Sequence, residues 1–483
     1  MLFNSFPFLL FFPTVVIAFF SVPKRFQIMT LLVASCYFYM AFVPQYILIL
    51  FFLITVDFFS AQAIDKRNGR ERKKFLLLSV LANLGILFVF KYFNFFNANI
   101  VALAAFLHWN YSPLLLAIAL PLGLSFHVFQ SLSYVIEVYR RKYKPENSFL
   151  TYALYVMFFP QLVAGPIERP QNLLPQLHLS HDFDAVNARK GLERMLWGFF
   201  KKMVIADQIA TIINPLFVDI PENGPALLFL MALFSYQLYC DFSGYSDIAI
   251  GSAQVLGFHL TENFNRPFAS RSIAEFWRRW HISLSNWLRD YLYYPLIFSV
   301  ERKTKWTVYY ATFVTFALIG LWHGANWTFV IMGALHGIYI IVGTVTEKFR
   351  KKFSDFLGVT KVPRIRHAFQ TLIVFWLASL SFVFFRSENI RQAWQILSHL
   401  GNGIVGFNIG NLKGFGFVGK NKGLEYLMII VMEIVQSFQE KRGTFYIFDD
   451  MRKGLRYAWY YALIIIILFF GYFGEQAFIY FQF

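Results

Sequence analysis

The sequence predicts an all-helical protein that crosses a membrane several times, and three observations support that prediction. Hydrophobic residues make up 57% of the chain and charged residues only 15%, whereas a soluble domain carries about 25% charged residues. The apolar residues form blocks that approach the roughly 20 residues a helix needs to cross a bilayer. The basic residues, which give a net charge of +17, gather in short segments between those blocks. We therefore expect about 11–13 transmembrane, re-entrant and interfacial helices.

Apolar segments suited to membrane helices are distributed along the whole chain. Their approximate starts are Phe6, Ile28, Tyr46, Phe75, Leu114, Leu150, Met195, Ala226, Trp306, Trp327, Phe369, Leu424 and Tyr457. Pro121, Pro160 and Pro166 interrupt otherwise apolar stretches. Irregular backbone at membrane depth persists only where protein shields it or where it lines a cavity. Because no repeat or low-complexity linker divides the chain, we expect one membrane-embedded domain, residues 1–483, with an enclosed site.

The distribution of lysine and arginine among the loops predicts the orientation of the chain. Residues 66–74 (KRNGRERKK) and 140–144 (RRKYK) are strongly basic, whereas residues 97–112 contain neither lysine nor arginine. Basic loops stay on the cytoplasmic side of a membrane. On this count the later basic segments, 347–366 and 440–456, also lie inside, and both termini lie outside the cytoplasm.

The composition also argues against several classes of function. Cys36 and Cys240 are the only cysteines and both lie inside apolar segments, which argues against a disulfide framework, a thiolate zinc site or a cysteine acyl relay. Positive charge that lies in membrane loops is no sign of nucleic-acid binding. The chain has no glycine-rich phosphate loop, HExxH motif or serine nucleophile elbow. We therefore predict no bound metal and no permanently bound cofactor.

The densest polar segment is residues 276–295, FWRRWHISLSNWLRDYLYYP. Helical spacing places Trp277 and His281 on one face and Arg278 and Arg279 mostly on the other. This pattern is typical of a helix at the membrane interface. His281 then either faces a protein core or belongs to a site, and the two arginines contact either lipid headgroups or the phosphates of a substrate.

Two more histidines lie in an apolar segment, residues 321–337, LWHGANWTFVIMGALHG. Ionisable groups at membrane depth are costly and usually face a cavity or a partner. A neutral histidine can take a proton from an attacking hydroxyl near physiological pH. For His323 a catalytic role and a hydrogen-bonded core role are both open, and for His336 the core role is favoured. Gly324 would allow close approach of backbone or substrate.

A third polar segment, residues 239–251 (YCDFSGYSDIAIG), places Asp241 and Asp247 in an apolar run. Two carboxylates at this spacing suit acid–base work or cation binding. The Ser-Gly-Tyr-Ser sequence between them equally suits a helix break with an aspartate as cap. We favour a structural or pocket-shaping role for this segment.

Taken together, these segments resemble the membrane-bound O-acyltransferase family, in its alginate O-acetyltransferase branch. The matching motifs are, in order, QLVAGPIERP (161–170), DFSGYSDIAIG (241–251), ENFNRPF (262–268), FWRRWHISLSNWLRDYLYYPL (276–296), LWHGANW (321–327) and FIYFQF (478–483). The resemblance spans most of the chain, with the core motifs in residues 161–337. A single His-Gly pair is weak evidence, but this ordered set is specific.

The resemblance implies a fold, a reaction and a set of site residues. The fold is a ring of helices around a thin centre, in the cytoplasmic (inner) membrane of a bacterium. His323 is the implied catalytic histidine and His281 the second polar residue. Other motif residues are expected to support the pocket: His336, Asp241, Asp247, Asn263, Arg266, Trp277, Trp280, Trp322 and Asn326. Arg278 and Arg279 are weaker candidates for binding the donor.

The implied reaction passes an acetyl group from a cytoplasmic thioester, such as acetyl-CoA, to an extracytoplasmic polysaccharide. An SGNH-type acetyltransferase outside the membrane is the expected partner, besides the bilayer and the glycan. Tyr480, Phe481 and Phe483 are expected either to form part of its docking surface or to pack back against the protein's own helices. Alternatives are D-alanyl transfer to teichoic acids, a lipid acyltransferase, and a transporter or flippase, which would show inverted repeats. The motifs do not distinguish alginate from peptidoglycan or another acceptor.

Overall fold

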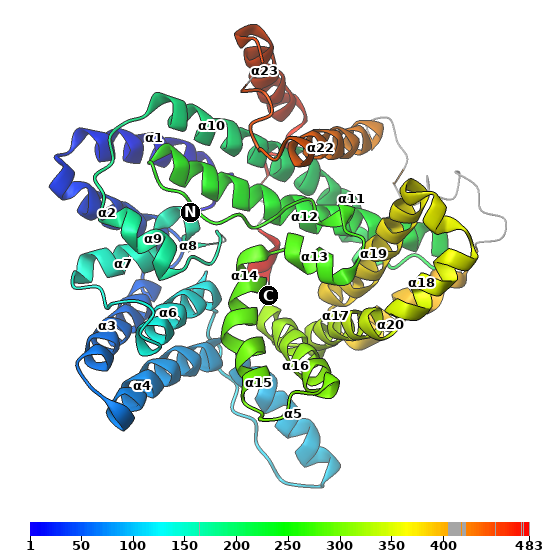
Figure 1. Ribbon diagram of the computed structural model, residues 1–483, viewed down its shortest axis with the longest axis horizontal. Coiled ribbons are helices and arrows are strands. Elements are labelled where there is room, and N and C mark those ends of the chain that lie inside the picture. The colour runs from blue at the N-terminus through cyan, green and yellow to red at the C-terminus, as the bar shows by residue number, and fades with distance from the viewer. Residues whose placement is uncertain are drawn as a thin grey trace. The chain divides into compact units, whose positions relative to one another are not determined.

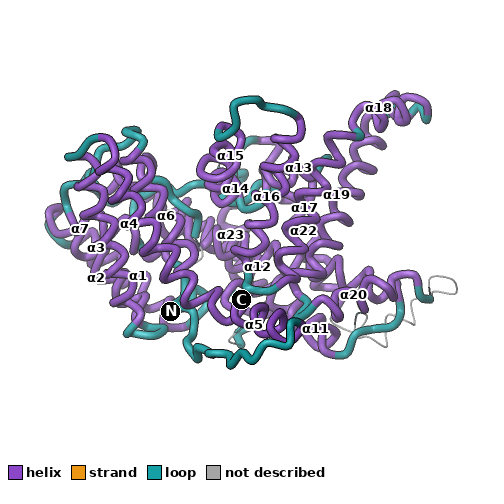
Figure 2. Tube along the Cα trace, turned by 90° about the horizontal axis from the view of Figure 1, so that it is seen from below, coloured by secondary structure: helices purple, strands orange, loops and turns teal. Residues whose placement is uncertain are grey.

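The structure is a computed structural model that describes residues 1–163, 165–403, 417, 422–449, 451–474, 476 and 478–482. Within these residues every regular element is a helix, as Figure 1 and Figure 2 show. The predicted all-helical membrane fold is confirmed. A helix is present at every predicted start except Leu114.

Among the described residues, six helices are long and apolar enough to cross a bilayer. They are α3 (Tyr46–Asp65), the continuous helix Gly69–Phe106, α12 (Gly224–Val255), α17 (Trp327–Val345), α19 (Pro363–Arg386) and α23 (Lys453–Phe470). Helix α1 (Phe6–Ser21) is apolar but shorter. Large apolar side chains on these helices are exposed, such as Phe469 of α23 at 78%. Water would not tolerate so many such side chains, whereas lipid solvates them.

The contacts within the chain divide it into two compact units. The first comprises Met1–Met195 with Ser246–Thr261, and the second comprises Leu196–Tyr245 with Glu262–Phe483. The chain passes from one unit to the other inside α10 (Ala185–Phe199) and again inside α12. Both core histidine motifs, with His281 and His323, belong to the second unit.

The first unit is built from short and medium helices around a few buried polar groups. Besides α1, α3 and most of α10, its helices are α2 (Gln27–Met40), α4 (Gly69–Leu87), α5 (Phe93–Phe106), α6 (Leu124–Tyr139), α7 (Phe149–Met157), α8 (Phe159–Leu162) and α9 (Pro170–Leu177). Asp57 of α3 is fully buried and accepts hydrogen bonds from Ser79 (2.6 Å) and Asn83 (2.9 Å) of α4. Because an unpaired carboxylate is expensive at membrane depth, these donors fasten α4 to α3.

The predicted helix at Leu114 is wrong. Residues 109–121 have no regular secondary structure, and the next helix begins at Leu124. Pro113 and Pro121 explain the difference, because each lacks an N–H donor and disfavours helical backbone in the residue before it. Asn97 of α5 donates a hydrogen bond to the Leu114 carbonyl (2.6 Å), so a side chain serves the backbone that a helix would have satisfied.

The second unit holds the longer helices of the carboxyl-terminal half. They are α11 (Asp207–Val218), most of α12, α13 (Ile273–Arg279), α14 (Ile282–Leu288), α15 (Tyr294–Phe298), α16 (Lys305–His323), α17, α18 (Glu347–Phe356), α19, α20 (Ile390–Ser398), α22 (Lys422–Arg442) and α23. Helices α16 and α17 lie side by side (Figure 1). Gly320 and Gly333 allow this, because a Cβ on either would collide with backbone of the other helix. Small residues at such crossings are typical of helix packing in membranes.

Candidate active site

His281 lies at a sharp break between two short helices rather than within one long helix. The continuous helix predicted across residues 276–295 is therefore wrong: α13 ends at Arg279 and α14 begins at Ile282. His281 adopts left-handed backbone, with φ 43° and ψ 56°, which is uncommon for a residue other than glycine. Such strain persists only where the surroundings enforce it, and it often marks a functional position.

Asn263 supplies the interactions that hold this break. Its carbonyl oxygen accepts a hydrogen bond from the Ile282 N–H (2.9 Å), and its side-chain oxygen accepts one from the Ser283 hydroxyl (2.8 Å). These bonds satisfy donors at the start of α14 that a preceding helical turn would otherwise occupy. Asn263 is fully buried, so it supports the position of His281 as expected of a residue near the site.

His323 is the last residue of α16, and it is buried beside a group of aromatic rings. Its ring centroid lies 5.0 Å from Trp322 and 5.7 Å from Phe385. Gly324 follows in extended backbone. The Phe329 ring lies where a Cβ of Gly324 would be, so protein rather than substrate uses the close approach that this glycine permits.

Tyr480 brings the two histidines into one site. Its ring centroid lies 5.4 Å from that of His323 and 6.5 Å from that of His281. Phe242 of α12 contacts both Tyr480 (4.6 Å) and His281 (4.7 Å), and Trp322 contacts His281 at 6.0 Å. The expectation that Tyr480 is an exposed docking residue is wrong, because its ring packs against the protein's own helices. The side chains of Phe481 and Phe483 lie outside the described residues.

Asp241 and Asp247 do not form a carboxylate pair. Asp247 is bound by Arg194 (3.0 Å) in the first unit, whereas Asp241 in the second unit lies 2.7 Å from Lys202. The helix break suggested by the intervening Ser-Gly-Tyr-Ser sequence is also wrong, because α12 runs unbroken from Gly224 to Val255. Gly244 instead allows close packing, since a Cβ there would lie 2.8 Å from the Gly198 carbonyl oxygen.

Lys202, Asp207 and Asp241 form a buried ion cluster. The Lys202 ammonium lies 2.7 Å from both Asp207 and Asp241, and all three residues are at most 3% exposed. Lys202 lies in the π-helical turn η3 (Phe200–Ala206), directly before α11. Because π-helical bonds join residues five apart, this turn brings Lys202 alongside Asp207.

His336 belongs to a separate, structural cluster. Its Nε2 lies 2.9 Å from the Ser381 hydroxyl, and its ring contacts Trp277 at 5.1 Å. Trp280 stacks on Phe276 in the same aromatic core. Trp277 and Trp280 therefore pack the base of the histidine break without contacting His323 in the manner of Trp322.

Asn326 is the N-cap of α17. Its side-chain oxygen accepts a hydrogen bond from the Thr328 N–H (3.1 Å), and its amide donates to the Glu388 carbonyl oxygen (2.8 Å). An N-cap of this kind stabilises a helix start by about 1 kcal/mol. Asn326 thereby fixes the turn that follows His323 and Gly324.

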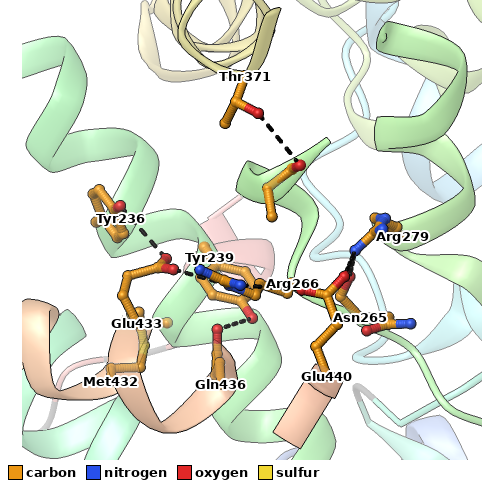
Figure 3. A network of polar contacts seen from close by, with 12 residues as sticks. Tyr236, Tyr239, Asn265, Arg266, Arg279, Thr371, Met432, Glu433, Gln436 and Glu440 are labelled. Atoms are coloured by element: carbon orange, nitrogen blue, oxygen red, sulfur yellow. Dashed lines mark hydrogen bonds and ion pairs between the residues drawn. The ribbon is translucent and has the colours of Figure 1, made fainter. Parts of the chain in front are cut away.

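Arg266 and Arg279 take part in the polar network of Figure 3. Arg279 lies 2.6 Å from Glu440 and 2.9 Å from Glu275, and Arg266 lies 3.0 Å from Glu440. Burial alone would raise the pKa of Glu440, but the hydrogen bonds from Arg279 and Arg266 outweigh it and hold that pKa below its usual value. The network joins α22 to the segment that carries His281. Arg278, in contrast, is exposed.

The fold and the site define a multi-pass membrane enzyme with two buried histidines around one tyrosine. Residues 146–387 match the membrane-bound O-acyltransferase family, and the chain belongs to that family. It is an O-acyltransferase.

Several curated proteins are similar to most of this chain. A protein named probable alginate O-acetylase from Pseudomonas aeruginosa is 37% identical over 402 residues, which cover 82% of this chain and 74% of that protein. A peptidoglycan O-acetyltransferase from Helicobacter pylori is 34% identical, covering 78% of this chain and 73% of that protein. A teichoic acid D-alanyltransferase from Bacillus subtilis is 30% identical, covering 48% and 61%.

Sequence reasoning missed the ion cluster and the inward position of Tyr480. Lys201 and Lys202 are two consecutive lysines in an otherwise apolar stretch, and a buried lysine requires an acidic partner. That signal was available, but the partner Asp241 lies 39 positions further along the chain and only the fold brings it close. Tyr480 stood in a recognised motif, but its neighbours come from four distant segments.

Proposed function

We propose that the protein is an O-acetyltransferase that moves acetyl groups from a cytoplasmic thioester, acetyl-CoA, toward an extracytoplasmic polysaccharide of the alginate type or a related cell-envelope glycan. The observation that carries this proposal is the contact of Tyr480 with both His323 and His281. A hydroxyl between two imidazoles suits acyl transfer, because the acceptor oxygen must lose a proton as it attacks. The named activities of the alginate and peptidoglycan relatives support an acetyl group and a glycan.

In the proposed reaction His323 acts as general base. Burial raises the pKa of the Tyr480 hydroxyl, so the phenol is neutral and needs a base in order to attack. As the Tyr480 oxygen bonds to the acyl carbon, its proton passes to His323, the carbon–sulfur bond breaks, and the thiolate leaves and takes up a proton. A glycan hydroxyl then displaces the tyrosine oxygen in the second transfer.

His281 has a different proposed role, which follows from its environment. Burial lowers the pKa of His281 to about 3, so its imidazole stays neutral and can orient or polarise the acyl group without adding charge. The proposed donor-phosphate contact falls to Arg278, because two carboxylates already hold Arg279.

The proposed orientation places both termini outside the cytoplasm, in the inner membrane of a bacterium. Reporter fusions after Lys74 and after Phe483 are expected to give opposite signals, because the basic segment 66–74 is retained inside. A fusion in the segment 97–112, which has no lysine or arginine, serves as a second outside control. Equal signals after Lys74 and Phe483 would contradict this orientation and the cytoplasmic entry of the donor.

The partner proposal leads to a reconstitution experiment. The purified protein with acetyl-CoA and glycan alone is expected to acetylate little polymer, and addition of an SGNH-type extracytoplasmic acetyltransferase is expected to restore transfer. The reason is that the donor and the polymer lie on opposite sides of the membrane in the proposed reaction. The His323→Ala protein with the same partner is the matched control. Efficient polymer acetylation without any second protein would refute the partner requirement, and no transfer from acetyl-CoA in either case would refute the proposed donor.

A further inference from the structure

We propose that the buried ion cluster of Lys202, Asp207 and Asp241 is a latch that holds the carboxyl-terminal segment in place, so that Tyr480 stays against the two histidines. The inference rests on the proposed function, because it assigns positioning residues to the same site. None of the three side chains is offered as a group that touches the acyl donor.

The latch divides the two oxygens of one carboxylate between two tasks. Asp241 Oδ1 lies 2.7 Å from the Lys202 ammonium, and Asp241 Oδ2 accepts a hydrogen bond from the Ile479 N–H (2.8 Å). A carboxylate can accept from both sides at once. The same side chain that pairs with the buried lysine therefore also binds the backbone of the residue before Tyr480.

Two further contacts join the same segment to the π-helical turn η3. The Tyr472 N–H donates to the Met203 carbonyl oxygen (3.0 Å), and the Lys202 ammonium lies 3.5 Å from the Gln476 carbonyl oxygen. Lys202 is thus shared by the carboxylates and the segment. Because η3 and α12 both contribute, the segment is held at several points along its length.

Burial makes these contacts strong. Lys202 is 1% exposed, Asp241 3% and Ile479 3%. One lysine faces two carboxylates, so a further donor at Asp241 helps to satisfy negative charge that water cannot reach. Hydrogen bonds to charged groups in such places are stronger than neutral ones. Withdrawal of the segment would leave Asp241 with an unmet acceptor, which favours the docked position.

The latch acts on Tyr480 through its immediate neighbours. Ile479 precedes Tyr480, so fixing the Ile479 amide restricts where the next ring can lie. Phe242 follows Asp241 and contacts the Tyr480 ring at 4.6 Å, and Tyr245, one turn along α12, contacts Phe478 at 4.6 Å. Consecutive residues of α12 thereby hold the backbone and the rings of the same short segment.

The sharpest test removes the amide donor without touching a buried charge. Ile479→Pro deletes the N–H at the first position of a short helical turn, where proline is tolerated. Ile479→Val keeps the N–H and is the matched control. We expect hydrogen exchange of residues 472–482 to become about tenfold faster in Ile479→Pro, with acetyl transfer falling about tenfold, and little change in Ile479→Val.

A second pair of variants tests the carboxylate. Asp241→Ala removes both contacts and is expected to release the segment, whereas Asp241→Asn keeps an acceptor for the Ile479 N–H and is expected to recover part of the exchange protection. Asp247→Asn alters another buried aspartate of α12 and should leave the exchange of residues 472–482 unchanged. If Asp241→Ala fails to fold, the proline variant decides alone.

The outcomes separate the latch from the proposed reaction. Unchanged exchange of residues 472–482 in folded Ile479→Pro would overturn the latch, whatever the activity. Faster exchange with undiminished transfer would overturn the positioning role. A Tyr480→Phe protein that is inactive while the latch variants stay fully active would leave the proposed reaction standing and refute the latch.

Discussion

The His323→Ala variant is expected to lose acetyl transfer by about 100-fold or more, because general base catalysis typically contributes about 10²–10⁴-fold. The aromatic rings around His323, Trp322 and Phe385 among them, would remain, so the fold should change little. Glycan acetylation in cells at matched protein levels measures the effect. His281→Ala is expected to lower activity as well, because its ring contacts the same tyrosine.

The matched control is a buried histidine outside the site. His336→Gln changes a residue that hydrogen-bonds Ser381 and packs on Trp277, so it is expected to lower stability while transfer per folded molecule stays close to wild type. Wild-type acetylation by His323→Ala would show that its catalytic assignment is wrong. Loss of activity in only one of the His281 and His323 variants would refute the two-histidine site while leaving the fold untouched.

Tyr480→Phe is expected to reduce acetyl transfer to a similar extent, although the substitution removes a single oxygen. The ring keeps its contacts with Phe242, His323 and Phe385, so a structural role would be preserved. In the proposed reaction, however, the acyl group has no phenol oxygen to bond to. Incubation with an acetyl thioester labelled in the acetyl group, followed by digestion, should place the label on the peptide that contains Tyr480.

Tyr461→Phe is the control for this experiment, because Tyr461 is 64% exposed on α23 and offers the same chemical change. It is expected to retain activity and labelling. Full activity of Tyr480→Phe would exclude the tyrosine as an acyl carrier, and direct transfer assisted by His323 would then be the simpler reaction.

The membrane class and the two histidines were predictable from the sequence, because both depend on local features. Apolar blocks of sufficient length specify membrane helices wherever they occur, and His281 and His323 lie in recognisable motifs. The packing around them was not predictable, since Phe242, His281, His323 and Tyr480 meet only after the chain has folded. Hydrophobic periodicity reports which face of an element is buried and not which distant side chain covers it.

The errors at the site share a physical cause. The segment 276–295 has helical periodicity on both sides of His281, and what interrupts it is Asn263, eighteen positions earlier, which binds the start of α14. Asp241 and Asp247 looked like a pair because they are close in sequence, yet each carboxylate found its own cation, Lys202 or Arg194. In both cases a long-range polar contact outweighed a local pattern.

The π-helical turn η3 also determines how the chain tolerates insertions and deletions. Lys202 and Asp207 are five positions apart, a spacing that in an α-helix would place them about 140° apart around the axis. Losing one residue from this turn would return it to α-helical form and still allow an ion pair at a spacing of four. The register of the helix would not survive, because α10 would rotate by about 100° relative to α11. The length of residues 200–206 is therefore expected to be less variable among related chains than the identity of its apolar residues.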